Sequence, residues 1–246
     1  LTTGDTAVLN ADDPIVRTMR DRTVANVVTF GESAEADVRA TDVRLDDMAR
    51  ASFTLTDHRD GKDEAQSVTL QFSGEHYVSN ALAASAAALS LGASMEQVAD
   101  ALRAATPQSR WRMEVREAPG GITVVNDAYN ANPESMLAAL DALVAMGAAT
   151  ERRPARRTWA VLGEMRELGG DAEAAHEQVG REAGQRGVGH VVAVGAPAYG
   201  VARGAEALGG ATVVQAVPDV DAAVELLRAQ ALAGDVVLVK ASRGSA

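Results

Sequence analysis

Two kinds of hydrophobic pattern follow one another along the chain. From residue 122 onward, short and nearly continuous apolar runs alternate with segments whose apolar residues recur at helical spacing. The runs predict strands over residues 122–126, 158–162, 190–194, 212–216 and 235–239, and the segments between them predict helices over 133–146, 172–185, 199–208 and 220–233. This alternation is typical of an α/β fold in which helices cover both faces of a parallel sheet.

The first part of the chain contains strands of a different kind. Apolar runs at 6–10 and 26–30 flank a short helix predicted from Pro14 to Met19, and β-like stretches follow at 37–45, 51–57 and 67–72, with a polar loop over 58–66. Because the later stretches alternate between apolar and polar residues, we predict a small antiparallel sheet with one face in water. Two helices follow, one ending at Leu91 and one over 94–105. We place a boundary near Pro107, which gives domains of residues 1–108 and 109–246.

Composition narrows the class of protein. The 34 acidic and 23 basic residues give a net charge of −11, which argues against a nucleic-acid binder because no sizeable basic face is left to neutralise phosphates. The chain has no cysteine, which excludes disulfides and thiolate metal sites and fits a reducing cytoplasm. No apolar run approaches the roughly 20 residues of a membrane span. We therefore expect a cytoplasmic protein that binds neither nucleic acid nor membranes.

The most informative polar residues follow the strand predicted over 122–126. Asn126, Asp127, Tyr129 and Asn130 form a cluster of donors and acceptors at its carboxyl end, where open parallel sheets bind their ligands. The carboxylate suits ribose hydroxyls or a hydrated cation, but an aspartate that only stabilises a turn explains it equally well. The Asn-Pro pair that follows is explained as a helix start.

Two other places carry side chains that suit a phosphorylated ligand. His76 and Asn80 share one face at the start of a predicted helix, where adenine or phosphate could bind, although polar first-turn residues are common. Lys240, Ser242 and Arg243 follow the last strand. They suit carboxylate or phosphate recognition, unless they are only the charges of a frayed chain end.

Three single residues and the lack of two nucleotide-binding motifs complete the functional evidence in the sequence. Arg112, at the expected domain joint, could reach a nucleotide between the domains, whereas the neighbouring Trp111 is better explained as interface core. His176, alone on a predicted helix, is better explained as a structural or merely exposed residue than as a functional one. No G-x-x-x-x-G-K-[ST] phosphate loop and no G-x-G-x-x-G motif occurs, and neither Lys62 nor Lys240 lies in a phosphate loop.

Taken in order, these segments resemble the Mur ligases, the ATP-dependent amino-acid and peptide ligases of peptidoglycan synthesis. The resemblance rests on residues 9–14, 74–84, 110–114, 126–133, 162–169 with His176, and 239–243. Tyr77, Glu164 and Ala241 depart mildly from the family's pattern. The Asn-Asp-Ala-Tyr-Asn-Ala-Asn-Pro element at 126–133 is similar to that of the members that add D-alanyl-D-alanine to UDP-N-acetylmuramoyl-tripeptide.

The resemblance implies a fold and a reaction. Residues 1–108 would be the back part of the family's central ATPase domain, with its small antiparallel sheet, and residues 109–246 its Rossmann-like C-terminal domain with a mostly parallel sheet. The N-terminal UDP-sugar domain, the phosphate loop and the main metal ligands would be missing, so we expect a monomeric fragment that is inactive alone and contributes no metal ligand. The intact enzyme would use ATP and Mg²⁺ to form an acyl phosphate, which the dipeptide amine attacks.

The resemblance also implies roles for the nucleotide-binding residues. Asn80, with His76 beside it, would lie near the adenine. Arg112 and Asp127 would lie near the ribose and phosphates.

For the reaction itself, the resemblance implies catalytic roles for Asp127, Tyr129 and Asn130. Asn130 would also bind substrate, together with Lys240, Ser242 and Arg243. Two alternatives stay open: another amide ligase of the superfamily, such as a folylpolyglutamate synthetase, or a non-catalytic α/β binding module whose polar strand ends only cap helices.

Overall fold

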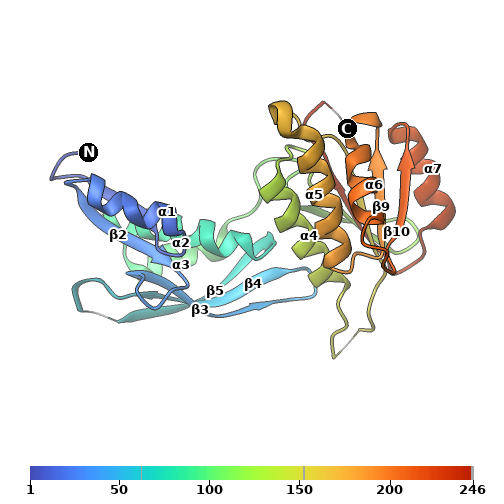
Figure 1. Cartoon of the computed structure of the whole chain (residues 1–246). Coiled ribbons are helices and arrows are strands. Elements are labelled where there is room, and N and C mark those ends of the chain that lie inside the picture. The colour runs from blue at the N-terminus through green and yellow to red at the C-terminus, as the bar shows by residue number, and fades with distance from the viewer. Residues whose placement is uncertain (62, 152, 245–246) are drawn as a thin grey trace. The chain divides into compact units, whose positions relative to one another are not determined.

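The computed structural model describes residues 1–61, 63–151 and 153–244 and divides them into two compact units (Figure 1). The first unit contains residues 1–46 and 50–106, and the second contains residues 47–49 and 107–246. Lys62, considered above for a phosphate loop, lies outside the described residues. Among the helices that the structure describes, none is long and apolar enough to cross a membrane.

The first unit is built on a five-stranded sheet. Its strands are β1 (Thr6–Asn10), β2 (Asn26–Gly31), β3 (Val38–Leu45), β4 (Arg50–Asp57) and β5 (Glu64–Ser73), and they lie in sequence order. The β3-β4-β5 part is antiparallel, as predicted, but β1 and β2 join the same sheet in parallel. The loop predicted over 58–66 is too long, because β5 begins at Glu64, where polar residues pair with the end of β4.

The described part of the first unit also contains three α-helices. They are α1 (Pro14–Arg17), continued by a 3₁₀ turn over Thr18–Arg22, then α2 (His76–Ser90) and α3 (Met95–Ala104); a second 3₁₀ turn spans Arg59–Gly61. The apolar stripe of α2, which includes Val78, Leu82 and Leu89, packs in one core with Phe53 and Leu55 of β4. Ser94 and Gln97 form a capping box that begins α3.

The second unit contains a six-stranded sheet in the order β10-β9-β8-β11-β7-β6. The strands are β6 (Glu114–Ala118), β7 (Ile122–Asn126), β8 (Thr158–Leu162), β9 (His190–Val194), β10 (Val213–Val217) and β11 (Val236–Lys240). All pairs are parallel except that of β6 with β7. Strand β6 was not predicted, because the Glu-Val-Arg-Glu-Ala sequence of this edge strand lacks an apolar run.

Four helices cover the two faces of this sheet. They are α4 (Pro133–Gly147), α5 (Ala172–Gln185), α6 (Tyr199–Glu206) and α7 (Val220–Gln230), with 3₁₀ turns at Gly169–Asp171 and Ala196–Ala198. Helices α5 and α6 cross at backbone contact: a Cβ atom on Gly180 would lie 1.9 Å from the carbonyl oxygen of Val201, and one on Gly204 would lie 1.9 Å from that of Glu177. Only glycine permits so close an approach.

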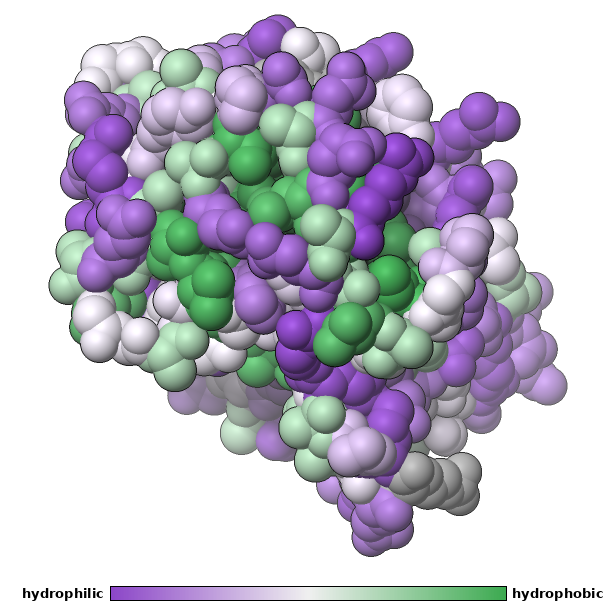
Figure 2. Space-filling model, turned by 90° about the vertical axis from the view of Figure 1, so that its right-hand side faces the viewer, coloured by the Kyte–Doolittle hydropathy of each residue, from purple (hydrophilic) through white to green (hydrophobic). Residues whose placement is uncertain are grey.

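The opposite face of the sheet is covered by α7. Its Ala223 and Leu227 pack on Trp159 and Val237. Beside α7, a groove of about 560 Å³ remains open, lined mainly by apolar side chains such as Val124 and Leu227. Figure 2, which views the molecule from the side of α7, shows apolar groups among the hydrophilic ones on this surface.

Candidate functional site

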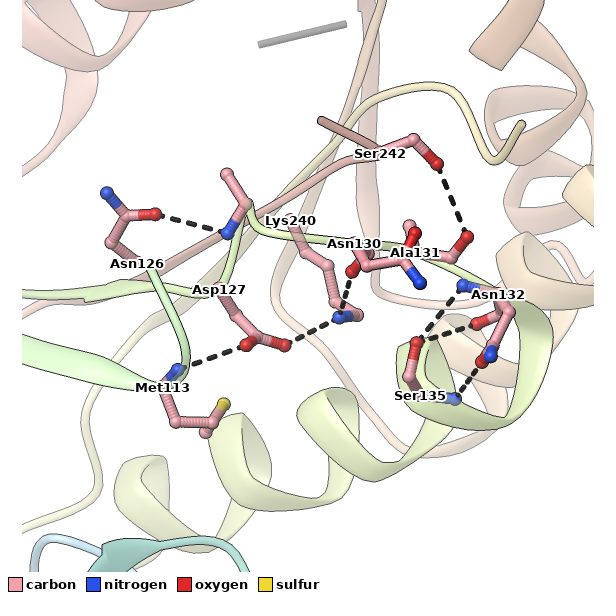
Figure 3. Close-up of polar contacts among 10 residues, drawn as sticks. Met113, Asn126, Asp127, Asn130, Ala131, Asn132, Ser135, Lys240 and Ser242 are labelled. Atoms are coloured by element: carbon pink, nitrogen blue, oxygen red, sulfur yellow. Dashed lines mark hydrogen bonds and ion pairs between the residues drawn. The ribbon is translucent and has the colours of Figure 1, made fainter. Parts of the chain in front are cut away.

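Three neighbouring parallel strands of the second unit end at one edge of its sheet. Asn126 of β7 pairs with Val239 of β11, and Leu162 of β8 pairs with Lys240 of β11. The segments that follow these strands therefore meet at this edge, which we call the carboxyl edge (Figure 3). Parallel α/β sheets bind their ligands at this position.

A buried ion pair joins two of these segments. The ammonium group of Lys240 donates to Oδ2 of Asp127 at 2.6 Å and to the carbonyl oxygen of Asn130 at 2.8 Å. The side chain of Lys240 is 3% exposed and that of Asp127 is 15% exposed, so the charges are held largely out of water. Burial of a lysine is tolerated because the carboxylate and the carbonyl replace its hydration.

The same aspartate holds a strained loop. The amide of Met113 donates to Oδ1 of Asp127 at 3.0 Å, and the amide of Tyr129 donates to the carbonyl oxygen of Trp111 at 3.1 Å. Trp111 and Met113 have positive φ angles of 63° and 46°, a conformation that costs non-glycine residues about 1–3 kcal/mol each. Both carboxylate oxygens of Asp127 are therefore engaged, one by the loop and one by Lys240.

Two arginines lie over one tyrosine ring at this edge. The guanidinium carbon of Arg112 is 4.3 Å from the centre of the Tyr129 ring, and that of Arg243 is 5.9 Å from it. Both arginines are exposed, and neither forms an ion pair with a residue in the described ranges. Guanidinium groups in this state are suited to bind a phosphate or carboxylate.

Ser242 ties the three segments together. Its hydroxyl donates to the carbonyl oxygen of Ala131 at 3.3 Å and accepts from the amide of Arg166 at 2.9 Å, while its amide donates to the carbonyl oxygen of Glu164. The residue is 4% exposed. These bonds fix the end of β11 against the segments that follow β7 and β8.

His176, on α5, stabilises the segment that follows β8. It is 1% exposed, its Nε2 accepts from the amide of Met165 at 2.8 Å, and its Nδ1 lies 2.6 Å from the carbonyl oxygen of Ala172. This arrangement requires the neutral ring protonated on Nδ1. The structure thus bears out the structural interpretation of this histidine.

Helix α4 begins at the carboxyl edge. Asn132 accepts from the amide of Ser135 at 2.8 Å, the Ser135 hydroxyl lies 3.1 Å from the amide of Asn132 in a capping box, and Pro133 is the first helical residue. The Asn132-Pro133 pair is therefore the helix start that the sequence predicts. Asn130, two residues earlier, is exposed.

His76 and Asn80 belong to the first unit. Both are exposed on the first turns of α2, and the His76 ring lies 4.3 Å from that of Tyr77, tilted by 37°. Gly74 has a positive φ of 124°, and a Cβ atom there would lie 2.5 Å from the His76 ring. The turn before α2 thus needs glycine both for its backbone conformation and for the place of this imidazole.

Sequence reasoning missed two features of the carboxyl edge. The first is the contact of Asp127 with the Met113 amide, which has no signal in the sequence because β6 was not predicted. The second is that Arg112 and Arg243, 131 positions apart, share one tyrosine ring. Only the pairing of β6, β7 and β11 brings these residues together.

Comparison with protein families identifies the class of protein. A model of the Mur ligase middle domain matches residues 1–88, and a model of the Mur ligase glutamate ligase domain matches residues 111–243. The chain therefore belongs to the Mur ligase family, and the predicted family and fold class are confirmed.

Individual relatives are similar over nearly the whole chain. The UDP-N-acetylmuramoyl-tripeptide–D-alanyl-D-alanine ligase of Mycobacterium tuberculosis (strain H37Rv) is 48% identical over 97% of the chain, which covers 48% of that relative. The crystal structure of MurF from Acinetobacter baumannii matches 100% of the chain with a TM-score of 0.81 and 28% identity, over 50% of its own length. The structure of MurF from Thermotoga maritima in complex with ADP shares the fold, with a TM-score of 0.77 and 24% identity over 99% of the chain and 51% of its own. The chain thus spans about half the length of the relatives it matches.

Proposed function

We propose that the protein to which this chain belongs is an ATP-dependent ligase of peptidoglycan precursor synthesis. It joins D-alanyl-D-alanine to UDP-N-acetylmuramoyl-tripeptide through an acyl phosphate, works as a monomer in the cytoplasm and needs neither membrane nor nucleic acid. Its similarity to the mycobacterial ligase over nearly the whole chain supports this choice within the family. The chain described here supplies part of that enzyme.

The observation that carries the proposal is the pair of arginines over Tyr129. Arg112 and Arg243 present two guanidinium groups to solvent at the carboxyl edge, directly beside the buried pair of Asp127 and Lys240. A ligase of this type handles substrates with phosphate and carboxylate groups, which such guanidinium groups bind in bidentate fashion. A module whose polar residues only cap helices has no need of two exposed cations that form no ion pair within the described part of the chain.

Each residue of the carboxyl edge then has a proposed task. Arg112 and Arg243 bind and orient phosphate or carboxylate oxygens. Tyr129 fixes the two guanidinium groups through its ring, and the exposed Asn130 contacts the dipeptide.

The buried residues act differently. Asp127 and Lys240 hold the loop at 111–113 and the segment at 127–130 in place, and Ser242 fixes the end of β11. We therefore propose that Asp127, expected to be catalytic, and Lys240 and Ser242, expected to bind substrate, contribute by positioning their neighbours. In the first unit, Asn80 and His76 are proposed to lie near the adenine.

In the proposed reaction the tripeptide carboxylate would take the γ-phosphoryl group of ATP with release of ADP, and the dipeptide amine would then displace phosphate to form the amide. The contribution of this chain is to hold charged groups in fixed places, which is how enzymes of phosphoryl transfer gain most of their rate. Among the residues that the structure describes, no group of three or more carboxylate or imidazole side chains that could hold a metal ion is found.

The test is an assay of phosphate release by the full-length protein with ATP, Mg²⁺ and UDP-N-acetylmuramoyl-tripeptide. We expect release to depend on D-alanyl-D-alanine. Arg112→Ala should lower kcat/KM by about a hundredfold, since it removes a fixed donor for developing negative charge. Arg112→Lys should restore only part of the loss, because an ammonium group lacks the planar fork.

The matched control is Arg228→Ala, which removes the same charge from an exposed ion pair on α7, where both side chains are 72% exposed. It should keep the wild-type kcat/KM. Equal losses in the two variants would contradict the site, and release driven by glutamate rather than by the dipeptide would assign the protein to another amide ligase of the family.

A further inference from the structure

A cavity with several charged residues in its lining lies at the end of the second unit's sheet opposite the carboxyl edge. Strands β7, β8 and β11 begin there, at Ile122, Thr158 and Val236, whereas the carboxyl edge lies where they end. The cavity has a volume of about 490 Å³. This size is ordinary for a site that takes a small molecule.

Three arginines line this cavity, which we call the arginine cavity. They are Arg153, Arg156 and Arg157, and the two carboxylates in the lining are Glu117 and Asp235. The lining thus carries three positive and two negative charges, in a chain whose net charge is −11. A local excess of positive charge in so acidic a protein favours an anionic ligand.

The two carboxylates of the cavity differ in how far neighbours engage them. Asp235 accepts from Arg157 at 2.9 and 2.6 Å, from the indole nitrogen of Trp159 at 2.9 Å and from the amide of Leu232 at 2.9 Å. Burial would raise the pKa of Asp235, but these hydrogen bonds hold it below its ordinary value. Glu117 accepts from the hydroxyl of Thr123 at 2.6 Å.

The guanidinium groups, in contrast, keep donors to spare. Arg156 uses Nε and Nη2 on the carbonyl oxygens of Gly234 and Asp235 and on Thr123, and Arg157 uses Nε and Nη2 on Asp235 and the carbonyl oxygen of Gln230. Arg153 uses Nη2 on the carbonyl oxygens of Met146 and Ala148 at the end of α4, and its Nη1 is buried without an acceptor among the described residues. Nη1 of Arg156 and Nη1 of Arg157 have no acceptor among the described residues, so both can donate to a ligand oxygen.

The charges of the cavity are also incompletely balanced. Burial, followed by the like charge of Arg153, lowers the pKa of Arg156 in spite of the opposing effect of Glu117 and Asp235. An anion between these guanidinium groups would remove the repulsion. Because Arg156 and Arg157 are already fixed by the backbone and by Asp235, their remaining donors need little ordering when a ligand binds.

We propose that the arginine cavity binds a phosphate-type oxyanion, either free phosphate or the phosphate group of a small molecule. Three guanidinium groups around one cavity match the several acceptor oxygens of a tetrahedral anion better than the two of a carboxylate. The site is separate from the carboxyl edge and does not depend on the proposed function.

The test is calorimetric titration of the chain with inorganic phosphate at pH 7.5 and low ionic strength, in a buffer without other oxyanions. We expect saturable binding that Arg153→Gln weakens about tenfold, the loss of one charge-assisted hydrogen bond. Arg203→Gln, which removes the same charge from exposed ion pairs on α6, should leave the affinity unchanged. A parallel titration with AMP separates the two sources, since a phosphate group of a larger ligand predicts tighter binding of AMP than of phosphate.

A second pair of variants guards against loss of folding. Leu232 lines the cavity and is 60% exposed, so Leu232→Glu and Leu232→Gln should both fold. The glutamate should weaken phosphate binding about tenfold relative to glutamine, by placing a carboxylate at the rim. The proposal is overturned if phosphate does not bind saturably, if both Leu232 variants bind alike, or if binding is lost in Arg112→Ala and Arg243→Ala instead.

Discussion

The buried charge of Lys240 is stable in the fold only because it has a partner of opposite charge. Its ammonium group is almost fully buried and donates to Asp127 and to the carbonyl oxygen of Asn130. Removing one member of such a pair leaves a buried charge without compensation, which costs more than the pair itself contributes.

We therefore expect Lys240→Met to lower the free energy of unfolding by about 3 kcal/mol, measured by urea denaturation. The double variant Lys240→Met/Asp127→Asn should lose less than the sum of the two single changes, because the second substitution neutralises the charge left by the first. Additive losses would show that the two groups do not interact in the folded chain.

A second prediction concerns the pH dependence of stability and His190. Its ring stacks on Trp159 at 3.7 Å with an angle of 8°, and burial, then Arg157, lowers its pKa despite Asp235. Since the unfolded chain binds this proton more readily, stability falls as the pH drops below about 6.5, the pKa of an unperturbed histidine. The loss is complete once the pH is below the folded pKa.

The variant His190→Phe keeps an aromatic ring for the stack and removes the titration. Thermal denaturation between pH 8 and pH 5 should therefore show a shallower fall in stability than in the wild type. The ring Nδ1 of His190 is buried without a hydrogen-bond partner among the described residues, so the variant should cost little at pH 8. An unchanged slope would mean that His190 is freely protonated in the folded state.

For individual residues, the sequence shows which polar side chains follow an apolar run. This is enough to single out Asp127, Tyr129 and Lys240 as candidate site residues. It does not indicate their partners. Asp127 and Lys240 are 113 positions apart and meet only because β7 pairs with β11. The pairing register of distant strands depends on the whole sheet and leaves no local mark.

Among the secondary-structure elements, α5 and α6 form the tightest contact. Gly180 and Gly204 each face a carbonyl oxygen of the other helix, so a methyl group at either position must push the helices apart. Gly184, on the same face of α5, meets only the end of the flexible Leu208 side chain at 2.8 Å.

Alanine at Gly180 or Gly204 should thus destabilise the chain by about 2 kcal/mol, because overpacking outweighs the gain in helix propensity. Alanine at Gly184 is the matched control and should change stability by less than about 1 kcal/mol, since the leucine can move. Urea denaturation of the three variants gives the comparison. A loss at Gly184 as large as at Gly180 would argue against backbone contact.

The strands with continuous apolar runs were predicted more accurately than the strands that consist mainly of polar residues. The five parallel strands of the second unit have continuous apolar runs and were predicted within one residue at each end. Strand β6 and the start of β5 were missed, because polar residues dominate both, and an edge strand needs an apolar residue only on one face. The apolar runs of β1 and β2 were found, but their parallel pairing with the antiparallel strands was missed, because the pairing of separate strands leaves no local mark in the sequence.

For the whole molecule, the excess of acidic residues determines how copies of the chain interact. The isoelectric point is near 4.8, so the net charge of −11 at pH 7 is lost on acidification. With repulsion gone, apolar surface such as the groove beside α7 is free to associate. Light scattering should show a solubility minimum at about pH 4.8 and dispersed chains at pH 7; the opposite order would contradict this account.

Because lysine is scarce in this chain, the rate at which Lys240 is acylated can be measured with little interference from other side chains. The chain has only two lysines, and the Lys240 side chain is 3% exposed. An acylating reagent reaches its amine only during moments when the end of β11 separates from the segment after β7. The speed at which mass spectrometry finds Lys240 acylated therefore reports how often this edge opens, and a bound substrate that holds it shut would slow the reaction.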